Sequence, residues 1–389
     1  MKIALVINEL NVRGGTHKQV LRLCEYLVNS KHDVTIYTKY YDAEKTYQEF
    51  KQYKVLYLTD GEKKQNNKKG LLHKISRNFD DVKCDLELLN MIPDDTDIIN
   101  IHDYGFLWLT LNLRKKKNSR VVWQVNDMPA YFRVGVAKEI EDSLGMKYKR
   151  ILHKHACKNI DAITVNVTKN KELADRCLNC DAKVFYCGVD ENKNLLPHTY
   201  DQMKDTVRIL STGVFFPYRN YETLVCAVEK LILAGKSVHL DIIGSTEWNP
   251  IYAKQISDMI GEKKLTDHIT VWGQVDEATY NDLYNKANVF AFININQSWG
   301  LAVFEAMSCG LPVIVSNSVG AIELLTHNEN AIILEPTDVE AVCETVINLV
   351  ENKDYYNKIS ENATNIVKKF TWDKLYSSKM LELFQQLKK

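Results

Sequence analysis

The sequence contains no apolar run that reaches the roughly 18 residues needed for a membrane-spanning helix. Its opening residues, MKIALVINEL, continue into a polar segment with glycines rather than into a signal-peptide cleavage site. A cytoplasmic protein is therefore expected. With 45% hydrophobic and 26% charged residues the composition is that of a globular protein, and 389 residues exceed what one core usually holds, which predicts two domains.

Patterns that would indicate a cofactor or a metal are also missing. Without a G-x-G-x-x-G fingerprint, a dinucleotide oxidoreductase is the least favoured enzyme class. The acidic residues at 94, 95 and 97 precede a strand and are interpreted as a turn. Nine cysteines, an odd number, favour reduced thiols over a disulfide framework. Cys177, Cys180 and Cys187 lack a fourth ligand and a second paired spacing, so ordinary thiols are favoured over zinc and no metal is expected.

A formal net charge of zero hides an asymmetry between the two halves. Residues 1–200 hold 33 Lys and Arg against 26 Asp and Glu, an excess of 7 positive charges, and the remainder therefore holds 17 against 24. The basic half includes Arg114 to Lys117 and the run from Lys147 to Lys154. Such runs fit a solvated face, a site for an anionic acceptor, or peripheral contact of the basic N-terminal domain with a membrane. No nucleic-acid partner is expected, and the oligomeric state stays open.

Strand-like and helix-like segments alternate along the chain, and the alternation restarts near its middle. Strands are expected at 3–7, 33–37, 97–102, 120–125 and 162–167, with helices from 16 and over 169–177. After a polar segment at 191–205, strands are expected at 207–213, 237–244, 269–275, 289–293 and 313–316, and helices at 221–233, 277–287, 301–307, 339–352, 355–368 and 372–389. The pattern predicts an α/β protein with two Rossmann-like domains, residues 1–195 and 196–370, and a closing helix at 371–389.

The stretch from Asn294 to Leu325 combines a polar loop, a helix and a strand. Gly300 ends the loop and the helix follows from Leu301. A glycine at such a junction lets the backbone approach a ligand, and the free amides of the first helical turn, with the helix dipole, form a phosphate site. Glu305 follows one turn later, where a carboxylate could hydrogen-bond a sugar diol. The plainer interpretation is an amphipathic αβ unit capped by glycine.

Glycines and polar residues also follow predicted strands of the first half, where open parallel sheets bind ligands. Gly14 and Gly15 follow the first strand at a place suited to a diphosphate or a sugar, although glycine pairs also simply permit turns. His102 with Asp103, and Asn126 with Asp127, follow two further strands. A lone histidine in such a place is more often structural than catalytic.

In the second half, Gly213 ends a strand and Arg219 lies in the turn that follows. A cation there would neutralise a diphosphate, whereas the plainer alternative is a surface arginine.

Residues 297–314, QSWGLAVFEAMSCGLPVI, resemble the signature of retaining GT-B glycosyltransferases of family four, E-G-F-G-L-x-x-x-E-A-x-A-x-G-x-P-V-I. The match departs from the pattern at the first glutamate, which is Gln297 here. The resemblance covers essentially the whole chain and is weakest over residues 41–94. It implies a GT-B fold, in which two Rossmann-like domains with parallel sheets face each other across a cleft and the closing helices pack back against the first domain.

The resemblance further implies transfer of a sugar, with retention, from a UDP- or GDP-sugar to a hydroxyl of a saccharide, lipid-linked or protein-linked acceptor, in polysaccharide, glycolipid or other glycoconjugate synthesis. The nucleotide-sugar is a substrate, so no cofactor is implied, and no metal is required if Arg219 and backbone amides meet the charge of the diphosphate. The leaving diphosphate can itself take the acceptor proton.

Individual residues acquire expected roles from the same resemblance. Glu305 would bind the ribose, and the loop that reaches Val275 would lie against the base. Asn126 stands where many relatives have a histidine beside the transferred sugar, and Val214 where they have an arginine. The candidate set is Asn126, Arg219 and Gln297 for catalysis, and Gly14, Gly15, Gly213, Arg219, Gly244, Val275, Gln297, Gly300, Leu301 and Glu305 for binding the donor.

Two alternatives to a transferase remain open within this fold. The departures at Asn126, Val214 and Gln297 fit a noncatalytic GT-B homologue, which would act as a nucleotide-sugar-binding or partner subunit. A GT-B epimerase or hydrolase would share the cleft but should show further carboxylates in the first domain.

Restoring the family's residue tests the most visible departure. Gln297→Glu should change donor preference or the rate of transfer if this side chain touches the sugar, because a carboxylate accepts hydrogen bonds that an amide nitrogen cannot. Initial rates with a panel of UDP- and GDP-sugars measure both quantities. Identical preference and rate in the two proteins would remove Gln297 from the sugar site.

Overall fold

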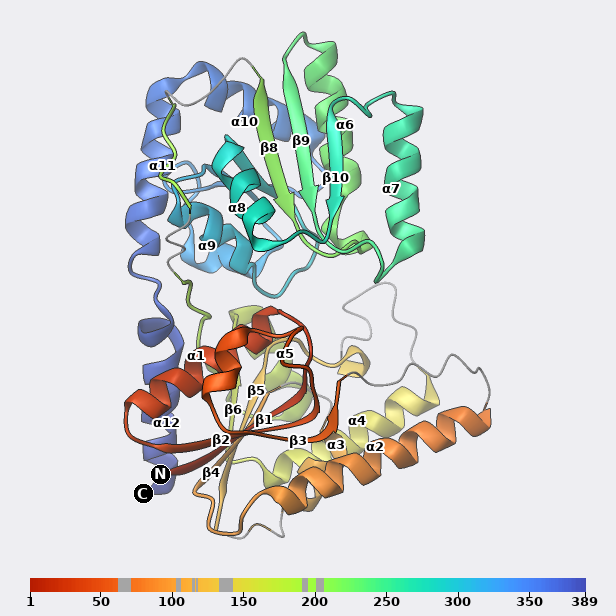
Figure 1. Cartoon of the computed structure of the whole chain (residues 1–389), viewed down its shortest axis with the longest axis vertical. Helices are drawn as coiled ribbons and strands as arrows, with labels where there is room; N and C mark the ends of the chain where they lie inside the picture. The colour runs from red at the N-terminus through yellow and green to blue at the C-terminus, as the bar shows by residue number, and fades with distance from the viewer. Residues whose placement is uncertain are drawn as a thin grey trace. The chain divides into compact units, whose positions relative to one another are not determined.

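The computed structural model describes residues 1–61, 71–102, 106–113, 116, 118–132, 143–190, 195–200 and 206–389, without the side chains of 71–79 and Ala130. The chain divides into two compact units. One comprises Met1–Gly188 and Trp372–Lys389, and the other comprises Val189–Thr371. Each unit is built on its own parallel β-sheet with helical connections (Figure 1).

The first unit contains a seven-stranded sheet in the order β3-β2-β1-β4-β5-β6-β7, in which neighbouring strands are parallel. Its strands are β1 (Lys2–Leu10), β2 (Asp33–Tyr41), β3 (Val55–Asp60), β4 (Ile98–His102), β5 (Arg120–Val125), β6 (Ala162–Val165) and β7 (Lys183–Val184). The central strand β4 is wholly buried and its neighbour β1 is buried from Ile3 to Ile7, as expected for a parallel sheet covered on both faces.

The helices of the first unit are α1 (Gly15–Asn29), α2 (Leu71–Met91), α3 (Leu107–Asn112), α4 (Leu144–Ala156), α5 (Thr168–Leu178) and α12 (Ser378–Lys388). A π-helical turn, Asp373–Ser377, precedes α12, so the helix expected over 372–389 is not regular along its length. The end of the chain is tied to this unit. The Tyr376 hydroxyl donates to Gln124 Oε1 at 3.3 Å, and Lys388 Nζ lies 3.0 Å from Asp97 Oδ1.

The second unit contains a six-stranded parallel sheet in the order β10-β9-β8-β11-β12-β13. Its strands are β8 (Val207–Thr212), β9 (Val238–Ile243), β10 (Ile269–Gly273), β11 (Val289–Phe292), β12 (Val313–Ser316) and β13 (Ile332–Leu334), and its helices are α6 (Tyr221–Leu233), α7 (Pro250–Glu262), α8 (Glu277–Lys286), α9 (Leu301–Ser308), α10 (Val339–Glu351) and α11 (Lys353–Val367).

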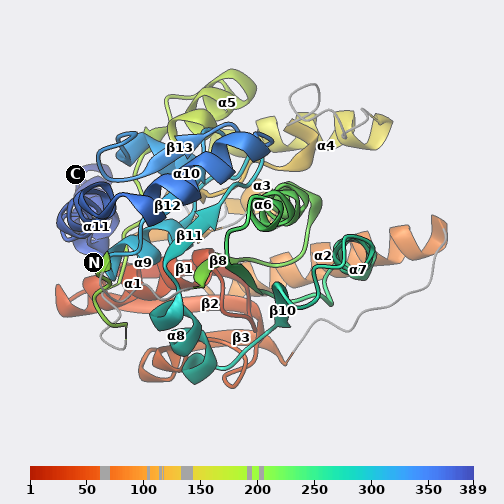
Figure 2. The same cartoon turned by 90° about the horizontal axis from the view of Figure 1, so that it is seen from above.

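The core of the second unit lies between this sheet and its helices. Helix α6 buries Tyr221, Leu224, Val228 and Leu231, which recur every three or four residues and so form one helical face. These side chains belong to one apolar cluster with α10 and with β8 and β9. Helix α7 lies beside the edge strand β10 in both views (Figure 2).

The strand order of both sheets creates a natural binding edge in each unit. Strands β1 and β4 are neighbours although β2 and β3 lie between them in sequence, and β8 and β11 have the same relation. Chain connections leave such a pair of strands in opposite directions, and ligands of doubly wound proteins bind at the carboxyl ends there. The exits of β8 and β11 are therefore the first place to look for a site in the second unit.

The expected fold class, two Rossmann-like parallel sheets, is confirmed. Some expected bounds are wrong. The strand expected over 269–275 ends at Gly273, whose φ of +68° turns the chain out of the extended conformation. The strand expected over 162–167 ends at Val165, and α11 begins at Lys353. Within the described residues, no helix is long and apolar enough to cross a membrane.

A single glycine tests whether the exits of β8 and β9 must touch. Gly244 has φ +156°, and a Cβ added to it would stand 1.9 Å from the Gly213 carbonyl oxygen. Gly244→Ala should lower the stability of the second unit by about 2–4 kcal/mol, because backbone must move to admit the methyl group. Scanning calorimetry measures the shift of the unfolding transition.

The control is Gly261→Ala in α7, where nothing lies within 4 Å of the added Cβ. That change should be neutral or stabilise by up to about 1 kcal/mol. Equal transition temperatures for the two variants would show that the close approach at Gly244 is not required.

Candidate functional site

The guanidinium of Arg219 lies directly against Gly213 at the exit of β8. A Cβ on Gly213 would stand 2.3 Å from Arg219 Cζ and 2.5 Å from Nη1, so only glycine leaves room for the arginine head. The backbone of Gly213 is held on both sides: its N–H donates to the Ile243 carbonyl at 2.8 Å, and its carbonyl accepts from the buried Tyr221 hydroxyl at 2.7 Å. The backbone at the end of β8 is thus held in a fixed position next to the Arg219 guanidinium.

Arg219 lies in a short 3-10 turn, Pro217–Arg219, that is anchored to the next strand exit. Asn220 follows in the left-handed conformation with φ 56°, and its side-chain nitrogen donates to the Ile293 carbonyl at 3.2 Å. The N–H of Ile295 donates back to the Tyr218 carbonyl at 2.7 Å. The turn after β8 and the loop after β11 are therefore one hydrogen-bonded structure.

The guanidinium of Arg219 is half-buried and lies beside two aromatic rings. Its Cζ lies 5.2 Å from the centre of the Tyr218 ring and 5.6 Å from that of Phe292, both at cation–π distance. Nε is buried without a hydrogen-bond partner. In the part of the chain that the structure describes, no carboxylate forms an ion pair with this arginine. A guanidinium held this way is prepared to receive an anion, because burying it unpaired is costly.

Asn294 connects Arg219 to Gln297. With its amide oxygen facing the guanidinium, the orientation that satisfies both groups, Asn294 accepts from Arg219 Nη1 at 2.9 Å and donates to the Arg219 carbonyl at 3.2 Å. In that orientation the Asn294 oxygen also lies 3.0 Å from the Gln297 side-chain amide, which donates to it when the Gln297 nitrogen is turned toward Asn294. The Gln297 carbonyl accepts from the Gly320 N–H at 3.0 Å, which holds the loop against the segment after β12.

The N-terminus of α9 begins beside the same aromatic ring. Gly300 packs so closely that an added Cβ would stand 3.1 Å from Phe292 Cε1 and 3.2 Å from Val319 Cγ1. No side chain caps this helix, so the amides of Leu301 and Ala302 are available to a ligand, whereas the N–H of Val303 donates to the Gly300 carbonyl at 3.0 Å. Because Phe292 contacts both Arg219 and Gly300, a cation and a helix N-terminus converge on one edge of the sheet.

Glu305 lies one turn into α9 and is half-buried. The Tyr280 hydroxyl from α8 donates to Glu305 Oε2 at 3.2 Å. Burial, followed by the charges of Tyr284 and Glu305, raises the pKa of Tyr280 well above its ordinary value, so Tyr280 remains a hydrogen-bond donor at neutral pH. This hydrogen bond orients the Glu305 carboxylate, whose two oxygens can accept further hydrogen bonds.

Gly244 and Val275 lie at neighbouring strand exits of the same sheet. The N–H of Gly244 donates to the Gly273 carbonyl at 2.8 Å. Val275 is half-buried in the loop between β10 and α8. With these two, the predicted residues of the second half, Gly213, Arg219, Gly244, Val275, Gln297, Gly300, Leu301 and Glu305, belong to the exits of β8–β11 and to α9.

Asn126, at the exit of β5, is already engaged within the first unit. Its side-chain nitrogen donates to Thr16 Oγ1 at 3.1 Å and to Gln19 Oε1 at 2.7 Å, and its oxygen accepts from Gln124 Nε2 at 3.1 Å. Both amide hydrogens are therefore used to attach α1 to β5. One acceptor position remains, so a sugar hydroxyl could donate to Asn126 but could not accept from it.

Gly14 and Gly15 form the junction between β1 and α1. Gly14 is the N-terminal cap of α1 in an extended conformation, and no side chain caps the helix. His17 folds back over the junction, with Nε2 2.9 Å from the Glu9 carbonyl, and burial lowers its pKa to about 4. The amides at this helix start are therefore near a neutral imidazole rather than a cation.

His102 has a structural environment at the end of β4. It is fully buried, its Nε2 lies 2.8 Å from Asn100 Oδ1, and burial lowers its pKa to about 3. A histidine that stays neutral and enclosed cannot exchange protons with a ligand, which supports the structural interpretation. Asp103 lies outside the described residues, and Asp127 is exposed.

All nine cysteines have free thiols in the structure. Cys180 Sγ donates to Asp175 Oδ1 at 3.7 Å, and Cys177 Sγ to the Phe132 carbonyl at 3.8 Å. Among the described residues, no group of three or more His, Cys, Asp or Glu side chains could hold a metal ion.

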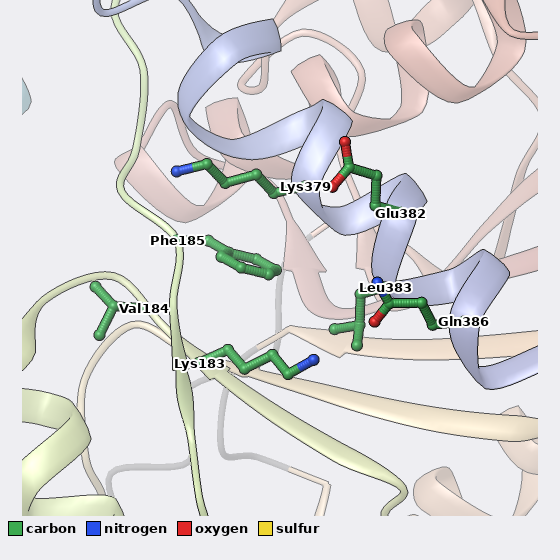
Figure 3. Close-up of a pocket in the computed structure, with 7 residues that line it drawn as sticks. All are labelled: Lys183, Val184, Phe185, Lys379, Glu382, Leu383 and Gln386. Atoms are coloured by element: carbon green, nitrogen blue, oxygen red, sulfur yellow. The ribbon is translucent and has the colours of Figure 1, made fainter.

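A groove of about 360 Å³ lies elsewhere, between β7 and α12 of the first unit (Figure 3). The Phe185 ring points into it, and it is also lined by Lys183, Val184, Lys379, Glu382, Leu383 and Gln386. It contains none of the residues predicted for the site.

The residues that hold the cluster together were not among those predicted from the sequence. Asn294 and Phe292 connect Arg219 to Gln297 and Gly300, and Tyr280 orients Glu305. A polar residue directly after an apolar strand was the available signal for Asn294. Nothing in the sequence shows that Tyr280 lies near Glu305, because their contact joins two helices.

Comparison with known proteins gives a consistent picture over both units. The family model described as glycosyl transferases group 1 matches residues 198–366, and that described as glycosyltransferase family 4 matches residues 13–193. An uncharacterized glycosyltransferase of Methanocaldococcus jannaschii is 24% identical over 225 residues, which cover 58% of this chain and 60% of that relative. The match thus spans less than two thirds of the relative.

Two solved structures are similar in fold along nearly the whole chain. Sucrose-phosphate synthase from Thermosynechococcus elongatus superposes with a TM-score of 0.79 at 19% identity, covering 99% of this chain and 98% of that one. HepE from Anabaena, in complex with UDP and glucose, superposes with a TM-score of 0.78 at 14% identity, covering 99% and 100%.

Proposed function

The chain belongs to the group 1, or family 4, glycosyltransferases with the GT-B fold, and from this premise we propose that it transfers a sugar from a nucleotide-diphosphate donor to a hydroxyl acceptor. The donor is held mainly by the second unit and the acceptor by the first. The proposed product keeps the anomeric configuration of the donor, and the proposed acceptor is a saccharide or a lipid-linked or protein-linked glycan.

The observation that carries this proposal is the half-buried guanidinium of Arg219, which has cation–π contacts and one amide acceptor but no carboxylate partner in the described structure. It lies at the exits of β8 and β11, the pair of strands at which the connections diverge. A diphosphate placed there would supply the missing anion and accept charge-assisted hydrogen bonds.

The start of α9 supplies the second part of the diphosphate site. Free amides at Leu301 and the positive end of the helix dipole favour negative charge, and Gly300 lets the backbone approach it. As the bond between the sugar and the diphosphate breaks, negative charge increases on the leaving oxygen. Donors fixed before the reaction stabilise that charge without reorganisation. Together with Arg219, these amides would neutralise the charge of the diphosphate without a metal ion.

Glu305 is proposed to bind the ribose. A carboxylate one turn beyond the amides lies within the length of a nucleoside diphosphate, and Tyr280 holds one of its oxygens. The backbone around Gly244 and the loop to Val275 are proposed to lie against the base. HepE, similar in fold, has been solved with UDP and glucose, which supports a UDP-sugar as the donor and leaves a GDP-sugar as the alternative.

The proposed reaction needs no protein base. The acceptor oxygen bonds to the anomeric carbon on the face from which the diphosphate departs, the bond between carbon and diphosphate oxygen breaks, and the acceptor proton passes to the leaving diphosphate. This scheme tolerates Asn126, an amide that cannot shuttle a proton. Gly14, Gly15 and Asn126 would then help to position the acceptor or the sugar, and Gln297 would contact the sugar.

A second candidate function, a noncatalytic nucleotide-sugar-binding or partner subunit, is favoured by one observation. Both amide hydrogens of Asn126 are committed to Thr16 and Gln19, so this position serves the attachment of α1 as well as any substrate. Gln297 and Val214 also depart from the family's pattern. A protein with these three departures could bind the nucleotide-sugar without transferring the sugar.

Turnover and the role of Arg219 can be tested in one series. The protein should release nucleotide from a UDP- or GDP-sugar in the presence of a hydroxyl acceptor, and NMR of the product should show the donor's anomeric configuration. Arg219→Gln should weaken UDP binding by about 10- to 100-fold in calorimetric titration, because charge-assisted hydrogen bonds of about 1.5–3 kcal/mol are lost. The UDP affinity of Arg219→Lys should fall between those of the native protein and Arg219→Gln.

The control is Lys254→Gln, an exposed cation of α7 that pairs with Asp258 and should leave UDP affinity unchanged. UDP binding with no release from any donor and acceptor pair would favour the noncatalytic alternative. Full affinity in Arg219→Gln would move the diphosphate elsewhere.

The ribose role of Glu305 predicts a loss of discrimination rather than only a loss of affinity. The native protein should bind UDP more tightly than 2′-deoxy-UDP, and Glu305→Ala should bind both equally, since a missing hydroxyl matters only while its partner is present. Tyr280→Phe retains the carboxylate and should preserve most of the preference. A preference that survives in Glu305→Ala would exclude contact with the 2′-hydroxyl.

A further inference from the structure

Helix α4 of the first unit exposes a stripe of large apolar side chains. Leu144 is 84% exposed, Tyr148 59% and Ile151 67%. They are spaced by four and then three residues, so they lie on one side of the helix, one above the other. Three neighbouring apolar side chains left in water are unusual on a globular surface and indicate an interaction.

The opposite side of α4 is packed, which fixes the direction of the stripe. His153 is 3% exposed and stacks on Trp123 with ring centres 4.9 Å apart, and Ala156 is buried. Arg150 Nη1 donates to the Tyr131 carbonyl at 2.9 Å. At 100° per residue, Tyr148 and Ile151 stand well over 90° away from His153 around the helix. The stripe therefore cannot turn inward without breaking this packing.

Cations border the stripe. Lys147 and Lys154 occur on one flank of the stripe in the helical projection, whereas Lys149 lies about 100° or more from each residue of the stripe. All three are exposed, and α4 contains no acidic residue. Figure 2 shows α4 along the margin of its unit. An apolar stripe flanked by lysines is a pattern by which a helix lies in a membrane interface, with apolar side chains in the acyl boundary and ammonium groups among the headgroups.

We propose that the stripe Leu144, Tyr148 and Ile151 with Lys147 and Lys154 is a docking face for an anionic lipid surface. Charge complementarity favours an anionic surface, because α4 itself carries lysines and no acidic residue. Leu233 on α6 illustrates the difference: it is 81% exposed, but no other apolar side chain of comparable exposure adjoins it on that helix. The face is independent of the donor site, and it would bring the first unit close to lipid-linked acceptors.

The test is co-sedimentation of the full chain with vesicles of phosphatidylcholine, with and without phosphatidylglycerol. The protein should bind the anionic vesicles, less tightly as salt increases. Replacing Leu144, Tyr148 and Ile151 by Ser should weaken partitioning at least about tenfold. Lys147→Glu with Lys154→Glu should weaken it by about fivefold or more for each cation. Leu233→Ser, the matched control, should bind as the native protein does.

An unchanged thermal unfolding transition shows that each variant is folded. The proposal is overturned if the native protein ignores anionic vesicles, or if the serine variant binds them equally well. It is also overturned if sedimentation velocity shows an oligomer that the serine variant abolishes while vesicle binding is absent, because the face would then be a protein interface. Vesicle binding is measured without donor or acceptor, so its failure leaves the proposed sugar transfer untouched.

Discussion

The second unit depends on keeping one guanidinium over one glycine. Arg219 can lie against the exit of β8 only because residue 213 has no side chain, and Gly213 keeps its place because Tyr221 and Ile243 hold its two backbone groups. Gly244 adds to the constraint, since its own lack of a Cβ lets β9 pass beside the Gly213 carbonyl. Asn294 then completes the arrangement by accepting from the arginine and contacting Gln297.

This arrangement explains how an edge lined by aromatic rings and glycines can hold a highly charged ligand. The unit has carboxylates nearby on its surface, yet none in the described structure pairs with Arg219. The guanidinium is instead supported by aromatic faces, which favour a cation without neutralising it. The uncapped start of α9 contributes further positive potential at the same edge. Binding an anion therefore stabilises this half-buried guanidinium more than it would stabilise an exposed arginine.

Much of the fold could be predicted from sequence, because buried parallel strands have continuous apolar sequences such as IALVI and VFAFI. The candidate site follows from the same pattern, because glycines and polar residues directly after those runs are expected at the binding edge. What could not be predicted are contacts between elements, such as Tyr280 with Glu305 or Asn126 with Gln19, which depend on packing. The exposed side of α4 also needed coordinates, since its sequence shows a basic run but not which side is covered.

The most direct test of the central claim is a crystal structure of the protein with UDP bound. The account predicts that β-phosphate oxygens lie within hydrogen-bond distance of the Arg219 guanidinium and of the backbone amides at the start of α9, with Asn294 still holding the arginine. A bound UDP whose phosphates contact neither Arg219 nor the first turn of α9 would contradict it.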